Sequence, residues 1–173
     1  MKVSPKKRVI VSVSNDLATD QRVKKVCNSL RALNLEILLV GRLLADSMEL
    51  NRPYQCKRMK LYFNKGALFY AEYNIRLFFL LVFSKVDIYH SNDLDTLLAN
   101  YLASRIRRKP LIYDSHEYFT GVPEIQNKPL VKGIWLCIEK WIFPKLKYIF
   151  TVNPSIAQLY KDEYHKDLLI MRN

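Results

Sequence analysis

Glycine is scarce in this sequence of 173 residues, which holds four glycines and none between Val9 and Val40. A dinucleotide-binding fold needs glycines directly after its first strand, because the backbone there approaches a pyrophosphate closely. The sequence therefore argues against an NAD-binding protein, and we expect it to work without a cofactor.

Cysteine is also rare, and the three cysteines are widely spaced along the chain and form no Cys-x-x-Cys pair. This spacing excludes a small scaffold held together by disulfides. We expect Cys27, Cys56 and Cys137 to be reduced side chains that pack in a cytoplasmic protein.

Long hydrophobic runs are missing too. Basic residues near the N-terminus precede an apolar stretch, but that stretch ends at Ser14 after about five residues, too soon for the core of a signal peptide. The most apolar segment, residues 66–83, carries Glu72 and Arg76. Its longest uncharged stretch falls short of the ~20 residues that cross a bilayer. We therefore expect neither export nor a membrane span.

Acidic residues are few, at 16 against 28 basic ones, which gives a net charge of +12. A surface this basic attracts nucleic acid or anionic lipid, or serves an anionic substrate. The basic residues are scattered over many elements and form no recognised nucleic-acid motif, so we expect no nucleic-acid partner. A non-catalytic binding module with a basic surface remains an alternative.

Short apolar runs alternate with longer helical patterns through the whole chain. Strands are predicted at residues 8–13, 35–40, 57–63, 86–90, 111–113, 148–152 and 168–171, and helices at 20–33, 66–83, 94–107, 130–143 and 155–164. This alternation predicts a single α/β domain over residues 1–173. We expect a three-layer sandwich with a mostly parallel sheet of about six or seven strands and helices on both faces.

Polar side chains follow several of these strands directly. The stretches after the first, fourth and fifth predicted strands are Ser14-Asn15-Asp16, His90-Ser91-Asn92-Asp93 and Asp114-Ser115-His116-Glu117. Open parallel sheets bind ligands in the crevice beyond the carboxyl ends of their strands. These polar stretches therefore predict a binding site at one edge of the sheet.

The residue types at this edge suit a carbohydrate. Asp16 and Asp20 place negative charge at the start of the first helix, where a phosphate would otherwise bind. Carboxylates, amides and a histidine are partners for sugar hydroxyls, which both donate and accept hydrogen bonds. Sugar recognition is thus a reasonable prediction, although other hydroxyl-bearing or cationic ligands also fit.

Four stretches together resemble a known family. "VSNDLATDQRVKKVCNSL", "DIYHSNDLDTLLANYLASR", "IYDSHEYF" and "IFTVNPSIAQLY…LLIMRN" look like the N-terminal half of a bacterial family 4 (group 1) glycosyltransferase with the GT-B fold. The resemblance spans nearly the whole chain. It implies a Rossmann-like domain that holds the acceptor and faces a second domain, absent from this chain, that binds a nucleotide-sugar.

The resemblance also implies an activity. Such enzymes transfer a sugar with retention at the anomeric carbon and usually need no metal, so no metal ligands are expected. The acceptor would be a carbohydrate or a lipid-linked sugar in cell-envelope polysaccharide synthesis. Without the donor-binding domain the fragment alone would be inactive. Half of a sugar-nucleotide epimerase, on the same fold, is a further alternative.

Site residues carry over by their place in the matched motifs. His116 matches the family's histidine at the reaction centre, where hydrogen bonding and electrostatic positioning fit better than base catalysis. Substrate-binding roles are implied for Asn15, Asp16, Asp20, Arg22, His90, Asp93 and Glu117, with Asp93 and Glu117 orienting His116 or binding acceptor hydroxyls. The family's glycine-rich loop after the first strand is replaced here by Ser14-Asn15-Asp16.

Some of these residues also suit structural roles. Asp20 can cap the first helix, Arg22 can pair with Asp16 or Asp20, and His90 can bond to a neighbouring loop.

Two helical segments combine basic residues with apolar and aromatic ones. They are "GALFYAEYNIRLFFLLVF" and "VKGIWLCIEKWIFPKLK", the second with Trp135, Trp141 and Phe143 among lysines. Interfacial helices on anionic lipid have this composition, although helices that simply cover a sheet can share it. Covering the sheet is the simpler explanation for both helices, and peripheral attachment of a cytoplasmic protein to the inner face of the cell membrane is the alternative hypothesis.

Overall fold

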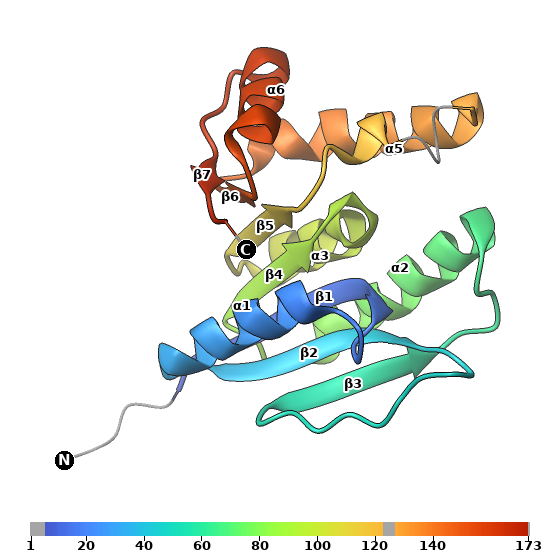
Figure 1. Cartoon of the computed structure of the whole chain (residues 1–173), viewed down its shortest axis with the longest axis vertical. Coiled ribbons are helices and arrows are strands. Elements are labelled where there is room, and N and C mark those ends of the chain that lie inside the picture. Colours follow the sequence, from blue (N-terminus) through green and yellow to red (C-terminus); the bar gives the residue numbers. More distant parts are fainter. Residues whose placement is uncertain (1–5, 123–126, 173) are drawn as a thin grey trace.

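The computed structural model describes residues 6–122 and 127–172. Seven strands form one sheet in the order β3-β2-β1-β4-β5-β6-β7 (Figure 1), and every neighbouring pair is parallel. The strands are β1 (Arg8–Asp16), β2 (Glu36–Leu43), β3 (Gln55–Lys60), β4 (Ile88–Asn92), β5 (Leu111–Ser115), β6 (Tyr148–Thr151) and β7 (Leu169–Ile170). This Rossmann-like topology confirms the predicted fold class.

Helices cover both faces of the sheet. They are α1 (Gln21–Ala32), α2 (Gly66–Phe83), α3 (Leu94–Arg107), α5 (Pro129–Ile142) and α6 (Pro154–Tyr164), with short 3-10 turns η1 (Phe119–Gly121) and η2 (Phe143–Lys145). Helix α1 packs on one face through a core that includes Val23 and Cys27. The larger core on the other face includes Tyr73 of α2, Leu97 of α3 and Trp135 of α5.

Several strands extend farther toward their carboxyl ends than the apolar pattern predicts. Strand β1 continues to Asp16, β4 to Asn92 and β5 to Ser115. Pairing between β4 and β5 runs through Asn92 and Asp114, because a ladder uses backbone groups and tolerates polar side chains. Several of the polar residues that we placed after the strands are thus the last residues of the strands themselves, whereas Asp93, His116 and Glu117 follow the strand ends.

Strand β2 passes through Gly41 instead of ending there. A Cβ atom at Gly41 would lie 2.8 Å from the carbonyl oxygen of Asn15 and 2.9 Å from Cγ of Leu17, so the end of β1 and the first residue of the loop after it rest directly on the β2 backbone. This close approach requires glycine and sets the position of the β1–α1 loop.

Helix α2 is the one described helix that is long and apolar enough to cross a membrane, by length and composition alone. Phe69, Tyr73, Leu77 and Leu81 on its inward face are buried in the larger core. Core helices of globular domains pass the same composition test, and the packing of α2 against α3 accounts for its apolar inner face.

Candidate functional site

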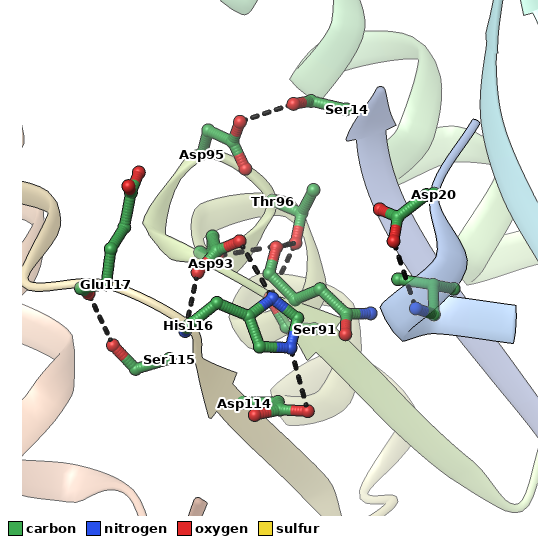
Figure 2. A network of polar contacts seen from close by, with 12 residues as sticks. Ser14, Asp20, Ser91, Asp93, Asp95, Thr96, Asp114, Ser115, His116 and Glu117 are labelled. Atoms are coloured by element: carbon green, nitrogen blue, oxygen red, sulfur yellow. Dashed lines mark hydrogen bonds and ion pairs between the residues drawn. The ribbon is translucent and has the colours of Figure 1, made fainter. Parts of the chain in front are cut away.

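Three neighbouring strands bring the candidate residues together. Strand β1 lies next to β4, and β4 lies next to β5, so the carboxyl ends of all three strands meet at one edge of the sheet. Asp16, Asp93 and His116 therefore share this edge, and Figure 2 shows the polar network around His116.

His116 lies between two carboxylates. Its Nδ1 atom is 3.2 Å from Oδ2 of Asp93, and its Nε2 atom is 3.2 Å from Oδ2 of Asp114. Asp93 also accepts a 2.8 Å hydrogen bond from the backbone N–H of His116. Only 6% of His116 is exposed, so two acidic side chains and the backbone fix its ring (Figure 2).

The carboxylates keep His116 protonated. Burial alone would lower the pKa of the imidazole, but the hydrogen bonds and charges of Asp114 and Asp93 raise it to about 10. Burial likewise opposes ionisation of Asp114, while His116 and His90 lower the pKa of Asp114 well below its usual range. A protonated histidine with both nitrogens engaged cannot accept a proton, so His116 acts here as a fixed positive charge.

Asp93 adopts a backbone conformation that is uncommon for a residue with a side chain, with φ of 59° and ψ of 169°. It precedes α3 but makes no side-chain cap to that helix. Its carboxylate instead reaches toward His116. Conformations of this kind cost free energy and concentrate at functional sites. The backbone of Asp93 is therefore consistent with a functional role for its side chain.

A second carboxyl group lies close by, on the first turn of α3. Asp95 accepts a hydrogen bond from the hydroxyl of Ser14 at the end of β1. Burial raises the pKa of Asp95, repulsion from Asp93 adds to the rise, and the Ser14 hydrogen bond offsets part of it, which leaves a pKa of about 7. Near neutral pH this group can therefore both donate and accept a hydrogen bond.

An open cleft of about 490 Å³ lies over these groups. Its lining includes the acids Asp93, Asp95 and Glu117 and the bases Arg22 and Arg42. A neighbouring hollow of about 400 Å³ shares Asn15, Arg22 and Arg42 with this cleft and adds Asp16 and Asp20. The edge thus offers hydroxyl-binding carboxylates beside anion-binding guanidinium groups.

The predicted substrate-binding acids at the start of α1 hold the local backbone. Asp20 accepts a 3.0 Å hydrogen bond from the N–H of Val23 and so caps α1 (Figure 2). Asp16 accepts a 2.7 Å hydrogen bond from the N–H of Ala18 and also bonds to Ser47. Among the described residues, Arg22 forms no ion pair with either acid and is exposed to the cleft.

The other predicted residues lie at different depths. His90 is buried on β4, with its Nε2 atom 3.6 Å from Oδ2 of Asp114, so it faces the interior network. Asn15 is exposed and lines the cleft. The side chain of Glu117 points away from the ring of His116 (Figure 2), so Asp93 and Asp114 orient the histidine.

Several residues that line the cleft were not predicted as site residues, and the first of two charged examples is Arg42. Arg42, near the end of β2, lies over the ring of Phe69 at 4.7 Å and lines both hollows. Asp95 is the second, and the stretch "NDLDT" holds a signal for it, since an acid within the first turn of a buried helix needs a polar partner. Among the described residues, no group of three or more His, Cys, Asp or Glu side chains is arranged to hold a metal ion.

The sequence matches the profile of glycosyltransferase family 4 over residues 20–168, a range that includes most of the cleft residues described above. The chain belongs to that family, and its fold is the Rossmann-like domain of GT-B proteins. No curated protein matches the chain at the sequence level.

Solved structures share the fold at low identity. Os79 from O. sativa, in complex with UDP and deoxynivalenol-3-glucoside, aligns with a TM-score of 0.60 and 10% identity over 94% of this chain and 51% of that one. The UDP-GlcNAc 2-epimerase of Methanocaldococcus jannaschii aligns with a TM-score of 0.53 and 14% identity over 96% of this chain and 45% of that one. MurG of Acinetobacter baumannii aligns with a TM-score of 0.54 and 9% identity over 98% of this chain and 45% of that one. The chain spans about half the length of these structures.

Proposed function

We propose that this chain is the acceptor-side, N-terminal half of a retaining glycosyltransferase. A second Rossmann-like domain would bind the nucleotide-sugar, and the transferred sugar would go to a carbohydrate or lipid-linked acceptor in cell-envelope polysaccharide synthesis. The observation that carries this proposal is the cleft lined by Asp93, Asp95 and Glu117 together with Arg22 and Arg42, in which Asp93 also contacts the buried His116.

The acids of the cleft would bind the acceptor. Asp95 and Glu117 offer oxygen atoms to sugar hydroxyls, and the pKa of about 7 lets Asp95 donate as well as accept. Arg22 and Arg42 suit the diphosphate of a donor that is presented from the opposite domain, because guanidinium groups bind phosphate oxygens in a bidentate geometry. Without that domain, leaving-group stabilisation is missing and the chain alone would be inactive.

In this proposal His116 works through charge and position. Its protonated ring holds the carboxylate of Asp93 toward the cleft and places positive charge beneath the reacting sugar. It takes no proton from the acceptor, which fits a transfer that proceeds on one face of the sugar. No metal enters this scheme.

Sugar binding by the chain tests the acceptor side directly. Titration of the ¹⁵N-labelled chain with glucose, N-acetylglucosamine and mannose should shift the amide signals of residues 14–22, 93–95 and 116–119. Asp95→Ala should weaken that binding by about tenfold, because it removes a hydrogen bond from a buried carboxyl group. The matched change Asp46→Ala, at an exposed acid outside the cleft, should have no effect. Shifts confined to other surfaces, or an equal loss in both variants, would contradict the acceptor assignment.

The epimerase alternative has support from the fold of the epimerase structures alone. An enzyme carrying both domains should release nucleotide from a nucleotide-sugar only when an acceptor is present if it is a transferase. Conversion of UDP-N-acetylglucosamine without any acceptor would favour the epimerase instead.

The outward face of α2 supports a membrane role for the same protein. Leu68, Ile75, Phe79 and Phe83 form an exposed stripe along this helix. Arg76 lies on the helix beside them, with its guanidinium 5.1 Å from the ring of the exposed Tyr62. Basic side chains beside exposed aliphatic and aromatic ones suit the surface of anionic lipid, where a lipid-linked acceptor would be located.

Helix α5 contributes less to such a surface than its composition suggests. Trp135 and Phe143 are buried in the core, whereas Trp141 is 47% exposed. Two of the three aromatic residues that favoured a membrane role for this segment therefore cover the sheet.

Vesicle sedimentation tests the α2 surface. At low salt the chain should sediment with vesicles that contain phosphatidylglycerol, and Phe79→Ser with Phe83→Ser should lower the bound fraction several-fold, since the pair removes the two most exposed aromatic side chains of α2. Leu33→Ser with Leu159→Ser, at exposed apolar positions on α1 and α6, is the matched control and should bind normally. Absence of any preference for anionic vesicles would end the membrane proposal.

A further inference from the structure

A second cavity, also of about 490 Å³, lies at the end of the sheet opposite the sugar-binding cleft. It is bordered by the C-terminus of α3 and by the first residues of β5 and β6, Leu111 and Tyr148. Its basic lining residues come from two separate stretches of the chain and are Arg105, Arg108, Lys109, Lys145 and Lys147. None of its described lining residues is acidic.

The end of α3 accounts for only part of this charge. Basic residues stabilise the C-terminus of a helix, which explains Arg105 in the last turn and Arg108 at the cap. Lys145 and Lys147, however, come from η2 and from the residue before β6. The fold therefore brings cations from outside α3 to the same cavity, where they repel the α3 arginines.

Few acids balance these cations. Lys109 pairs with Asp87, with its Nζ atom 3.0 Å from Oδ1. Within residues 6–122 and 127–172, the other four basic lining residues form no ion pair with an acid. Lys145 instead lies over the ring of Trp141 at 5.0 Å. An anion in the cavity would relieve the repulsion between these like charges.

The cationic lining groups suit a phosphate. The buried Ser104 already donates its hydroxyl to the carbonyl of Tyr101, so the basic side chains would supply the donors for the anion. Guanidinium groups bind phosphate oxygens through two parallel hydrogen bonds, and ammonium groups add point charges. A neutral sugar would gain little from five cations.

We propose that this cavity binds a phosphorylated anion, at a site separate from the sugar-binding cleft. The shared chemistry is a phosphate or diphosphate group, supplied either by the headgroup of an anionic lipid or by a free phosphorylated metabolite. The site does not depend on the transferase function, because none of its lining residues lies at the carboxyl edge of the sheet.

The first experiment uses inorganic pyrophosphate as the probe. In the ¹⁵N-labelled chain, pyrophosphate should shift the amide signals of residues 104–111 and 145–148 and leave residues 14–22 and 93–95 unchanged. Arg105→Gln with Lys145→Gln should raise the dissociation constant about tenfold, which corresponds to about 1.4 kcal/mol.

The matched control is Arg31→Gln with Lys140→Gln. Arg31 lies in the last turn of α1 and Lys140 on the exposed face of α5, and neither lines the cavity. This pair removes the same charge, and Arg31 also tests whether a helix C-terminus alone binds the anion. Binding that falls equally in both pairs, or shifts spread over the whole surface, would overturn the proposal.

A second arm with vesicles distinguishes the sources. Sedimentation with phosphatidylglycerol vesicles that is lost in the Arg105/Lys145 pair and kept in the control pair would identify a lipid headgroup. Specific pyrophosphate binding without a vesicle effect of this pair would identify a free phosphorylated ligand. The site would be overturned if pyrophosphate does not bind and if the Arg105/Lys145 pair has no specific effect on vesicle binding.

Discussion

Replacing His116 by asparagine is expected to lower the free energy of unfolding at pH 7 by about 3–5 kcal/mol, the usual cost of removing one partner from a buried ion pair. The side chains of His116 and Asp114 are 3% and 5% exposed, and their ring nitrogen and carboxylate oxygen are 3.2 Å apart. The substitution leaves Asp114 with only His90 at 3.6 Å. Asp93 loses the same partner but is partly exposed, so water compensates it more easily.

Urea denaturation of the chain and its variants measures this loss. His165→Asn is the matched control, because His165 is exposed and caps α6 in a left-handed conformation that asparagine tolerates. It should change the stability by less than about 0.5 kcal/mol. Adding Asp114→Asn to His116→Asn should recover part of the loss, since it removes the stranded charge. Equal stability of His116→Asn and the native chain would contradict the buried ion pair.

The pH dependence has a defined sign. The pKa of His116 is about 10 in the folded chain and near 6.5 without its partners. Its contribution to stability is therefore complete below about pH 6.5 and is lost as the pH rises through about 10. The native chain should lose stability between pH 8 and 10 more steeply than His116→Asn. NMR titration of the histidine ring signals should show one imidazole that stays protonated at pH 8.

Turnover should fall with the same substitution in the enzyme that carries both domains. Removing one preorganised electrostatic partner of a reaction centre typically lowers kcat by about 100-fold. His165→Asn should leave turnover unchanged. Because His116 is also part of the buried network, the comparison needs conditions in which each variant is folded, and unchanged kcat in folded His116→Asn would remove the histidine from the mechanism.

Asp95→Asn is expected to stabilise the chain at pH 8 by about 2–4 kcal/mol, because one pKa unit corresponds to about 1.4 kcal/mol. The folded pKa of Asp95 is about 7, above the ordinary value of 3.8. The stability that this group contributes is present at low pH and is lost as the pH rises from about 4 through about 7. Asparagine keeps an oxygen that accepts from Ser14 and never ionises.

Stability profiles from pH 4 to 8 test this prediction. The native chain should lose stability over that range, and Asp95→Asn should lose clearly less. The stability of Asp95→Asn should still fall somewhat as the pH rises, because burial and repulsion by Glu163 also raise the pKa of Glu139 to about 7. Asp46→Asn, at an exposed acid, should retain the full native slope. A profile of Asp95→Asn that matches the native one would show that Asp95 ionises freely in the folded chain.

The alternation of apolar runs with helical patterns was sufficient to predict the parallel sheet and its edge. The carboxyl ends of the strands were not predictable from hydrophobicity, since Asn92 and Asp114 belong to the ladder through their backbones. The second strand was predicted to end at residue 40, before Gly41, because glycine is disfavoured inside strands. In the fold Gly41 is a contact point for the loop after β1, and only the tertiary arrangement reveals that.

The location of the candidate site was predictable from the sequence, but most contacts of its individual residues were not. Polar residues after neighbouring strands had to converge, and they do. The sequence allowed for Asp20 capping its own helix, which it does, but it could not tell that Asp114 and Asp93 lie against both nitrogens of His116. The contact with Asp93 joins the residue after β4 to the residue after β5, 23 positions apart in the sequence, and no local pattern encodes it. Asp95 escaped notice because one acid on a helical turn is ordinary in a soluble helix.

The central position of the first strand has a consequence for biosynthesis. β1 is made before the other strands of this sheet, and it is bordered on one side by β4, with the backbone N–H of Arg8 bonded to Asp87, 79 residues later. At ribosomal speeds of about 5–20 residues per second, that partner arrives several seconds after β1. During this interval the nascent chain carries an apolar strand with an open edge, a natural substrate for a holding chaperone.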